Sequence, residues 1–268
     1  MKFNKKNFYP KFIISLISIT ILLSSLTSLA DDIDFLEEAT NNNSNIKENQ
    51  IIETYSNNEK QLNLNSRSCI VLDRTSKQIL FGKNEYNKVK MASTTKIMTE
   101  IIVENDDLNK TIEISKKAAN TGGSRLGLKT GDKITIHDLL YGLMLCSGND
   151  AAVALAECTA GSIPDFSELM NKKASELGLQ NSHFESPHGL DSDGHYTTAY
   201  ELAKLADYAL NNKTFSQIVG TKTYTATING NSKNLSNTNE LLGNLNGVYG
   251  IKTGFTNGAN RCIVTACK

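Results

Sequence analysis

The stretch MASTTKIMT, Met91–Thr99, carries the strongest structural and chemical signal in this sequence. From Ile97 to Ile102 the apolar residues recur at helical spacing, which predicts a buried helix that begins near Ser93. Three residues apart on a helix, Ser93 and Lys96 lie on the same face. A serine hydroxyl becomes a nucleophile when a neighbouring base takes its proton, so this pair predicts covalent catalysis with Ser93 as nucleophile and Lys96 as base.

Two further motifs follow in a fixed order. Ser147-Gly148-Asn149 precedes a predicted helix, and its hydroxyl and amide suit a proton relay and the binding of a substrate amide, respectively. Lys252-Thr253-Gly254 lies in a predicted strand, where Lys252 and Thr253 suit a substrate carboxylate and Gly254 permits the close approach of a peptide. Lys252 is also a second cation that lowers the pKa of Lys96, whose amine must be neutral to act as a base.

The same short patterns occur elsewhere in the chain. Ser44–Lys47 matches the first motif, but it lies in an asparagine-rich stretch without apolar periodicity. Lys129–Gly131 matches the third motif, but it lies in a turn and precedes Ser147. Order and context therefore assign the site to the motifs at Ser93, Ser147 and Lys252.

Composition divides the 268 residues into three parts. Residues 1–30 combine early lysines, a long apolar run and the small residues Ser28-Leu29-Ala30, which is typical of a cleaved secretory signal peptide. An uncleaved membrane anchor is the alternative, because the apolar run is just long enough to span a bilayer. Residues 31–66 hold eight acids, two lysines and nine asparagines, which predicts a disordered tether. Residues 67–268 are the predicted catalytic domain, exported to the outer face of the membrane or to the cell wall.

The predicted catalytic domain is of the α+β class. Two short strands, 69–72 and 78–81, flank a run of turn-forming residues and predict a hairpin. Strands at both ends with helices between them favour a single sheet in which the terminal strands pair. Helices are predicted at 136–145, 150–159, 165–177 and 198–210, and further strands at 221–228, 250–256 and 261–267. Thr198 and Glu201 form the pattern of a capping box at the start of the last of these helices.

Six segments, from about Ser68 to the last residue, together resemble the D-alanyl-D-alanine carboxypeptidase family of low-molecular-weight penicillin-binding proteins. They are Asp73-Arg74-Thr75 with Gln78–Phe81, Met91–Thr99, Ser147–Ala152, Pro187–Asp191, Asn237–Asn239 and Gly250–Thr256. The motifs S-x-x-K, S-D-N and K-T-G are known from penicillin-binding proteins and class A β-lactamases. The resemblance implies a β-lactamase/transpeptidase-like fold, with a five-stranded antiparallel sheet flanked by helices. It also implies removal of the terminal D-alanine from peptidoglycan stem peptides.

The resemblance implies further roles and ligands. The oxyanion hole would be formed by the backbone N–H groups of Ser93 and Phe255. β-Lactam antibiotics such as penicillin would bind at the same serine, and no cofactor is expected. The family continues with another strand and a covering helix beyond the position of Lys268, so the last strand and the C-terminal helix are expected to be missing. A poorly stable or catalytically silent protein is therefore an alternative to an active enzyme.

A β-lactamase is the nearest alternative enzyme, because it shares the fold and the acylation chemistry. Class A enzymes place a glutamate between the second and third motifs to drive water onto the acyl-enzyme. Glu185 is the candidate at a similar place, but it lacks the expected neighbouring Leu-Asn pair. The sequence therefore favours the carboxypeptidase.

Other function classes find little support in the composition. The chain balances 28 basic against 28 acidic residues and has no tryptophan, so nothing resembles a basic face for nucleic acid. The four histidines show no zinc-ligand pattern and are expected to be structural. The spacing of the five cysteines argues against a disulfide framework and favours buried free thiols.

Overall fold

Helix α2 (Lys96–Val103) lies at the centre of the helical part of the structure. The computed structural model describes residues 64–104 and 106–268, in which Ser66–Lys268 form one unit. Every residue of α2 except Ile102 is buried, as expected for a helix surrounded by others. It packs against α4 (Ile136–Leu145), α5 (Asn149–Ala160), α6 (Ile163–Glu176) and α7 (Ala199–Ala209). The predicted signal peptide, 1–30, and almost all of the predicted tether, 31–66, lie outside the described residues.

Several helices begin at side-chain caps that the sequence supplies, whereas α2 and α5 have no such cap. Thr135 accepts a hydrogen bond from the Asp138 N–H at the start of α4, which has the predicted bounds. Thr198 caps α7 in the same way by accepting from the N–H of Glu201 at 3.0 Å. In a full capping box the Glu201 carboxylate would also accept from the backbone N–H of Thr198. This part of the prediction is wrong, because the carboxylate accepts instead from the N–H of Asn181 and the hydroxyl of Ser182. This acid therefore ties α7 to the preceding loop.

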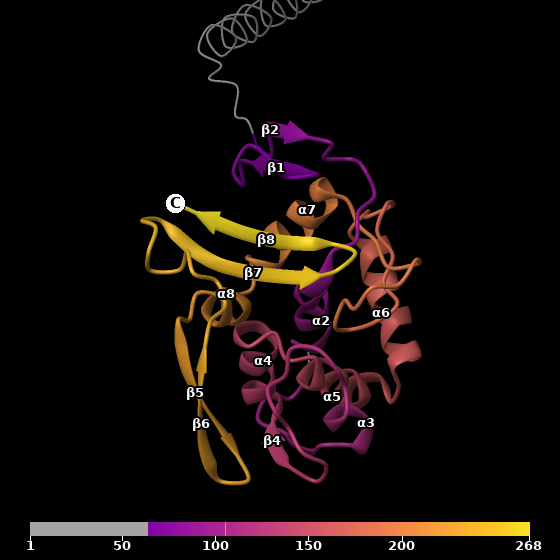
Figure 1. Ribbon diagram of the computed structural model, residues 1–268, viewed down its shortest axis with the longest axis vertical. Coiled ribbons are helices and arrows are strands. Elements are labelled where there is room, and N and C mark those ends of the chain that lie inside the picture. Colours follow the sequence, from indigo (N-terminus) through magenta and orange to yellow (C-terminus); the bar gives the residue numbers. More distant parts are fainter. Residues whose placement is uncertain (1–63, 105) are drawn as a thin grey trace, which may run out of the picture. The chain divides into compact units, whose positions relative to one another are not determined.

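The strands form four antiparallel ladders of two strands each in the described residues. They are β1 (Cys69–Leu72) with β2 (Ile79–Lys83), β3 (Thr111–Glu113) with β4 (Lys133–Thr135), β5 (Thr223–Ile228) with β6 (Asn231–Ser236), and β7 (Val248–Thr256) with β8 (Asn260–Cys267). The α+β class is confirmed, but the prediction of one sheet joining the terminal strands is wrong. Helix α7 contacts both β1 and β8, so the two terminal hairpins share a helix as their packing surface (Figure 1).

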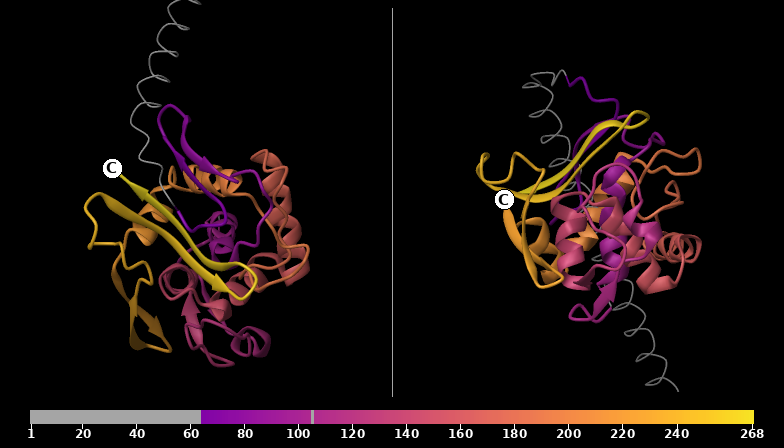
Figure 2. Two further views of the ribbon diagram at one scale, coloured as in Figure 1. Left: turned by 45° about the horizontal axis from the view of Figure 1, so that its top comes forward. Right: turned by 60° about the horizontal axis from the view of Figure 1, so that its bottom comes forward.

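Several short elements escaped the sequence patterns. These are β3, β4, β6, the four-residue helix α3 (Lys116–Ala119) and α8 (Lys213–Val219). Each is too short or too polar to produce a clear period of 2 or 3.6 residues. The two strands of the longer β7–β8 hairpin were predicted, at 250–256 and 261–267, but their pairing with each other was not. Figure 2 shows this hairpin from two directions.

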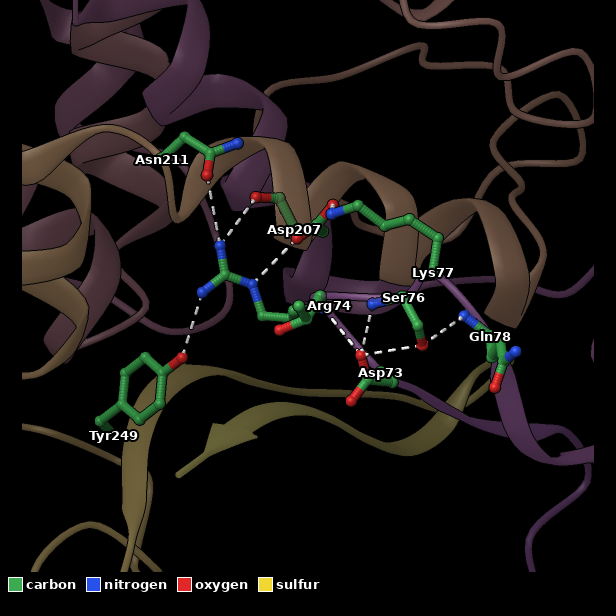
Figure 3. A network of polar contacts seen from close by, with 9 residues as sticks. Asp73, Arg74, Ser76, Lys77, Gln78, Asp207, Asn211 and Tyr249 are labelled. Atoms are coloured by element: carbon green, nitrogen blue, oxygen red, sulfur yellow. Dashed lines mark hydrogen bonds and ion pairs between the residues drawn. The ribbon is translucent and has the colours of Figure 1, made fainter.

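A polar network fixes the first hairpin to the rest of the unit (Figure 3). The guanidinium of Arg74 donates to Asp207 Oδ1 on α7 at 2.9 Å and to the hydroxyl of Tyr249 on β7 at 3.3 Å. Lys77 donates to the other oxygen of Asp207 at 2.6 Å. The planar, multi-donor Arg74 side chain thus connects the β1–β2 turn, α7 and β7 at one point.

The cysteines are all free, as the sequence predicts. Four of them are only partly buried, and Cys267 is exposed, so the expectation of uniformly buried thiols is wrong. In the described part of the chain, no helix is both long enough and apolar enough to span a bilayer.

Glu100 is a buried acid in the core of α2. Its side chain is 1 % exposed, and neither carboxylate oxygen has a hydrogen-bond partner in the described residues. Burial, and to a lesser extent the nearby acid Glu104, raise the pKa of Glu100 well above its ordinary value of 4.5. Above pH 4.5, Glu100 therefore holds its proton more strongly in the folded protein than in the unfolded chain.

This buried acid predicts a pH-dependent loss of stability. Because the folded-state pKa of Glu100 is raised, its contribution is most favourable below the ordinary value of 4.5 and is lost progressively as pH rises towards the folded-state pKa. Denaturant unfolding at a series of pH values should show a smaller decline with rising pH for Glu100→Gln than for the unmodified protein. The exposed Glu113→Gln is the control. An unchanged pH dependence in Glu100→Gln would contradict the assignment.

Candidate active site

Ser93 and Lys96 meet where a short 3-10 helix, η1 (Ala92–Thr95), continues into α2. The Lys96 amine lies 2.9 Å from Ser93 Oγ, 2.8 Å from Asn149 Oδ1 and 2.9 Å from the backbone oxygen of His188. The two carbonyl oxygens can only accept, so they hold two amine hydrogens. In the neutral amine the lone pair is then left for the proton of Ser93, which is the geometry that a general base needs.

The environment of Lys96 favours the neutral amine. The side chain is completely buried, and burial is the largest cause that lowers its pKa well below the ordinary 10.5. The positive charge of Lys252 lowers the pKa further, as the sequence predicted, whereas Asp150 opposes both effects. Asp150 is itself occupied by backbone donors, including the N–H groups of Leu126 and Gly127.

The backbone before the nucleophile has a constrained conformation. Ala92 has φ of 48°, in the left-handed region that non-glycine residues rarely adopt. Its carbonyl oxygen accepts from the Thr95 hydroxyl at 2.8 Å, and Gly189 packs so closely on it that a Cβ at residue 189 would lie 1.9 Å away. His195 Nδ1 accepts from the Glu185 N–H, so in the neutral ring Nε2 carries the hydrogen and donates to Thr95 Oγ1. These contacts hold the turn that presents Ser93.

The second motif lies on the loop before α5. Ser147 is 6 % exposed and has φ of 57°, while Asn149 is the first residue of α5. Asn149 holds Lys96 through Oδ1 and donates through Nδ2 to the Gly122 oxygen at 2.7 Å. Both polar atoms of this amide therefore contact protein groups, and substrate binding by Asn149 stays a prediction. The relay role of Ser147 likewise stays a prediction.

Strand β7 supplies the third motif. Lys252 is 1 % exposed, and burial lowers its pKa to about 7, with a small opposing effect from Cys146. Its amine donates to the Thr253 oxygen at 3.0 Å, and the Thr253 hydroxyl lies 2.7 Å from that of Thr238. Asn239 donates to the Gly250 oxygen at 2.8 Å, so the Asn237–Asn239 segment supports β7.

Gly254 brings β7 against the nucleophile. A Cβ at this position would lie 3.0 Å from the backbone nitrogen of Ser93 and 3.1 Å from the Ala92 Cβ, so a side chain would force the two segments apart. Phe255, the next residue, has a side chain that is 63 % exposed. The backbone N–H of Ser93 and the end of β7 are therefore neighbours, which is the arrangement expected for an oxyanion hole.

Sequence reasoning missed part of this site. The His188 carbonyl, Gly189 and Asp150 all contact catalytic candidates or their support, but none was predicted for that role. His188 and Gly189 lie in the Pro187–Asp191 segment, which is one of the six segments that carry the family resemblance and could have indicated their role. No group of three or more His, Cys, Asp or Glu side chains in the described residues could hold a metal ion.

Comparisons with known proteins agree with this geometry. A family model described as D-alanyl-D-alanine carboxypeptidase matches residues 55–268. The chain belongs to this family. It is 38 % identical over 210 residues to D-alanyl-D-alanine carboxypeptidase DacF of Bacillus subtilis, covering 76 % of this chain and 54 % of the relative. The chain thus spans about half the length of that relative.

Similar proteins from Streptomyces K15 are found both in sequence and in structure. The D-alanyl-D-alanine carboxypeptidase of Streptomyces sp. strain K15 is 37 % identical over 206 residues, covering 70 % of this chain and 71 % of the relative. The structure of the S216A mutant of Streptomyces K15 DD-transpeptidase superimposes with a TM-score of 0.74 and 34 % identity, over 78 % of this chain and 87 % of that chain. The β-lactamase/transpeptidase-like fold is therefore confirmed.

Glu185, the candidate deacylating base of a β-lactamase, is exposed. Its carboxylate accepts a hydrogen bond from the Ser192 hydroxyl within the same loop. This contact is local and does not place the acid at Ser93, which agrees with the family assignment.

Removing the charge of Lys252 is expected to raise the pKa of Lys96, because like charges disfavour the ammonium form. The pKa should remain below 10.5 in Lys252→Gln, since burial is the larger cause. NMR titration of ¹³C-labelled lysine side chains measures this, with the Lys96 signal assigned by its loss in Lys96→Gln. Lys233→Gln serves as a matched control, because Lys233 binds the Leu126 oxygen. An unchanged Lys96 titration in Lys252→Gln would contradict the coupling.

Proposed function

We propose that this chain is a serine-type D-Ala-D-Ala carboxypeptidase that removes the terminal D-alanine from peptidoglycan stem peptides. The observation that carries the proposal is the buried Lys96 amine, which lies 2.9 Å from Ser93 Oγ and has two carbonyl oxygens as its other partners. The family assignment supports D-Ala-D-Ala peptides as substrate and β-lactams as inhibitors at the same serine.

The acylation step follows from the positions of these groups. Ser93 Oγ attacks the carbonyl carbon of the penultimate D-alanine while its proton passes to Lys96. The carbonyl electron pair moves onto oxygen, where the N–H groups of Ser93 and Phe255 stabilise the oxyanion by about 3 kcal/mol each. When the tetrahedral intermediate collapses, the C–N bond breaks and the leaving D-alanine takes the proton, with Ser147 as relay. An ester between Ser93 and the shortened peptide remains.

Deacylation reverses the roles with water as nucleophile. Water attacks the ester carbonyl, its proton passes to Lys96, and the proton then returns to Ser93 Oγ as the C–O bond breaks. The substrate carboxylate binds at Lys252 and Thr253 on β7. A bound carboxylate favours the charged form of Lys252, so substrate restores a charge that the free site holds only below a pH of about 7.

We also propose that the protein acts outside the cytoplasm. The lysines and apolar run of residues 1–30 support a signal peptide, and the acidic composition of residues 31–66 supports a tether to the catalytic domain. The substrate class supports the same location, because stem peptides are part of the cell wall.

Labelling with a fluorescent penicillin tests this function. The unmodified protein should form one covalent adduct on the peptide that contains Ser93, and Ser93→Ala should form none. Ser44→Ala, which removes the other serine of the same short pattern, should label normally. Hydrolysis of a D-Ala-D-Ala peptide with release of free D-alanine should be lost in Ser93→Ala and retained in Ser44→Ala. Labelling that persists in Ser93→Ala would overturn the proposal.

A further inference from the structure

One loop, residues 187–195, contacts several parts of the active site. The Pro187 oxygen accepts from the Thr99 hydroxyl of α2 at 2.6 Å, and the His188 oxygen accepts from Lys96. Gly189 packs on the Ala92 oxygen. A few residues further along the chain, Asp191 reaches the end of β7. The loop therefore joins the base, the nucleophile turn and the strand that carries Phe255.

Asp191 makes two hydrogen bonds to the β7–β8 turn. Oδ1 accepts from the Thr256 hydroxyl at 2.7 Å, and Oδ2 accepts from the Gly258 N–H at 2.9 Å. The hydroxyl oxygen of Thr256 in turn accepts from the Ala259 N–H at 3.1 Å, so the Thr256 side chain links Asp191 to both sides of the turn. A Cβ at Gly258 would lie 2.9 Å from the Asp191 carboxyl carbon, so this close approach requires glycine.

This contact bears directly on the oxyanion hole. Thr256 follows Phe255, and in the described residues β7 pairs with β8 alone. The hairpin packs on η1 near Gly254, and Asp191 adds a hydrogen-bonded link to its turn. Gly254 packs its backbone directly on η1 without a side chain to hold it there, so the Asp191 link at Thr256 supplies a side-chain contact next to Phe255.

We propose that Asp191 is a positioning residue that holds the Phe255 N–H at the correct distance from Ser93. This proposal rests on the proposed acyl-transfer function. Asp191 is negative and an oxyanion is also negative, so its charge cannot stabilise the intermediate, and its contribution is geometric. The charged or titratable groups that interact with it are Lys90, His195 and Cys262. Lys90 also pairs with the exposed Asp193 at 3.5 Å.

The proposal predicts a specific kinetic change. Both acylation and deacylation pass through an oxyanion, so Asp191→Ala should slow both rate constants by about tenfold to a hundredfold. The burst of penicillin labelling should still approach one per molecule, because the nucleophile and base are intact. Thr256→Val should also slow both steps, because it removes the hydrogen bond between Thr256 and Asp191. The double variant should be no slower than Asp191→Ala, since both changes remove this same hydrogen bond.

Two further variants separate geometry from charge and from loop stability. Asp191→Asn should recover most of the lost rate, because its amide oxygen can accept from the Gly258 N–H and its amide N–H can donate to Thr256. Asp193→Ala, two residues away on the same loop, should acylate at the rate of the unmodified protein. Normal rates in Asp191→Ala, an Asp191→Asn variant as slow as Asp191→Ala, or a reduced burst with unchanged rates would each overturn the positioning role. If the unmodified protein itself takes no label, the proposed function fails instead.

Discussion

The burial of one amine is the constraint on which the rest of the site depends. Lys96 has no exposed surface, and its three partners are Ser93 Oγ and two oxygens that can only accept. Removing an ammonium from water is costly, so this environment favours the neutral form. Packing and the nearby charge of Lys252 thus lower the pKa of Lys96, as its proposed role as a base requires.

The fold supplies this environment from distant parts of the chain. Helix α2 is surrounded by helices, which removes water from Lys96, and the start of α5 provides the Asn149 oxygen. Strand β7 brings Lys252 near the base and Gly254 against Ser93. The loop of residues 187–195 contacts both α2 and the β7–β8 hairpin. The site is therefore the meeting point of segments that have no role in catalysis separately.

The sequence predicted what depends on local spacing. Ser93 and Lys96 meet because three residues form most of a helical turn, and α4 has its predicted bounds because Thr135 caps an apolar run. The sequence could not reveal that the His188 carbonyl holds Lys96, because every residue carries a backbone oxygen and this contact spans 92 positions. The single-sheet prediction failed for a similar reason, since strand pairing between distant segments depends on tertiary packing, here on α7.

The pH dependence of acylation tests the central claim most directly. The rate constant for acylation by saturating penicillin should increase with pH as Lys96 loses its proton, and saturation separates this step from binding at Lys252. The account predicts that the increase is complete well below pH 10.5, the ordinary pKa of a lysine. A rate that continues to rise through pH 10.5 would show that Lys96 titrates as an exposed lysine and would contradict the account.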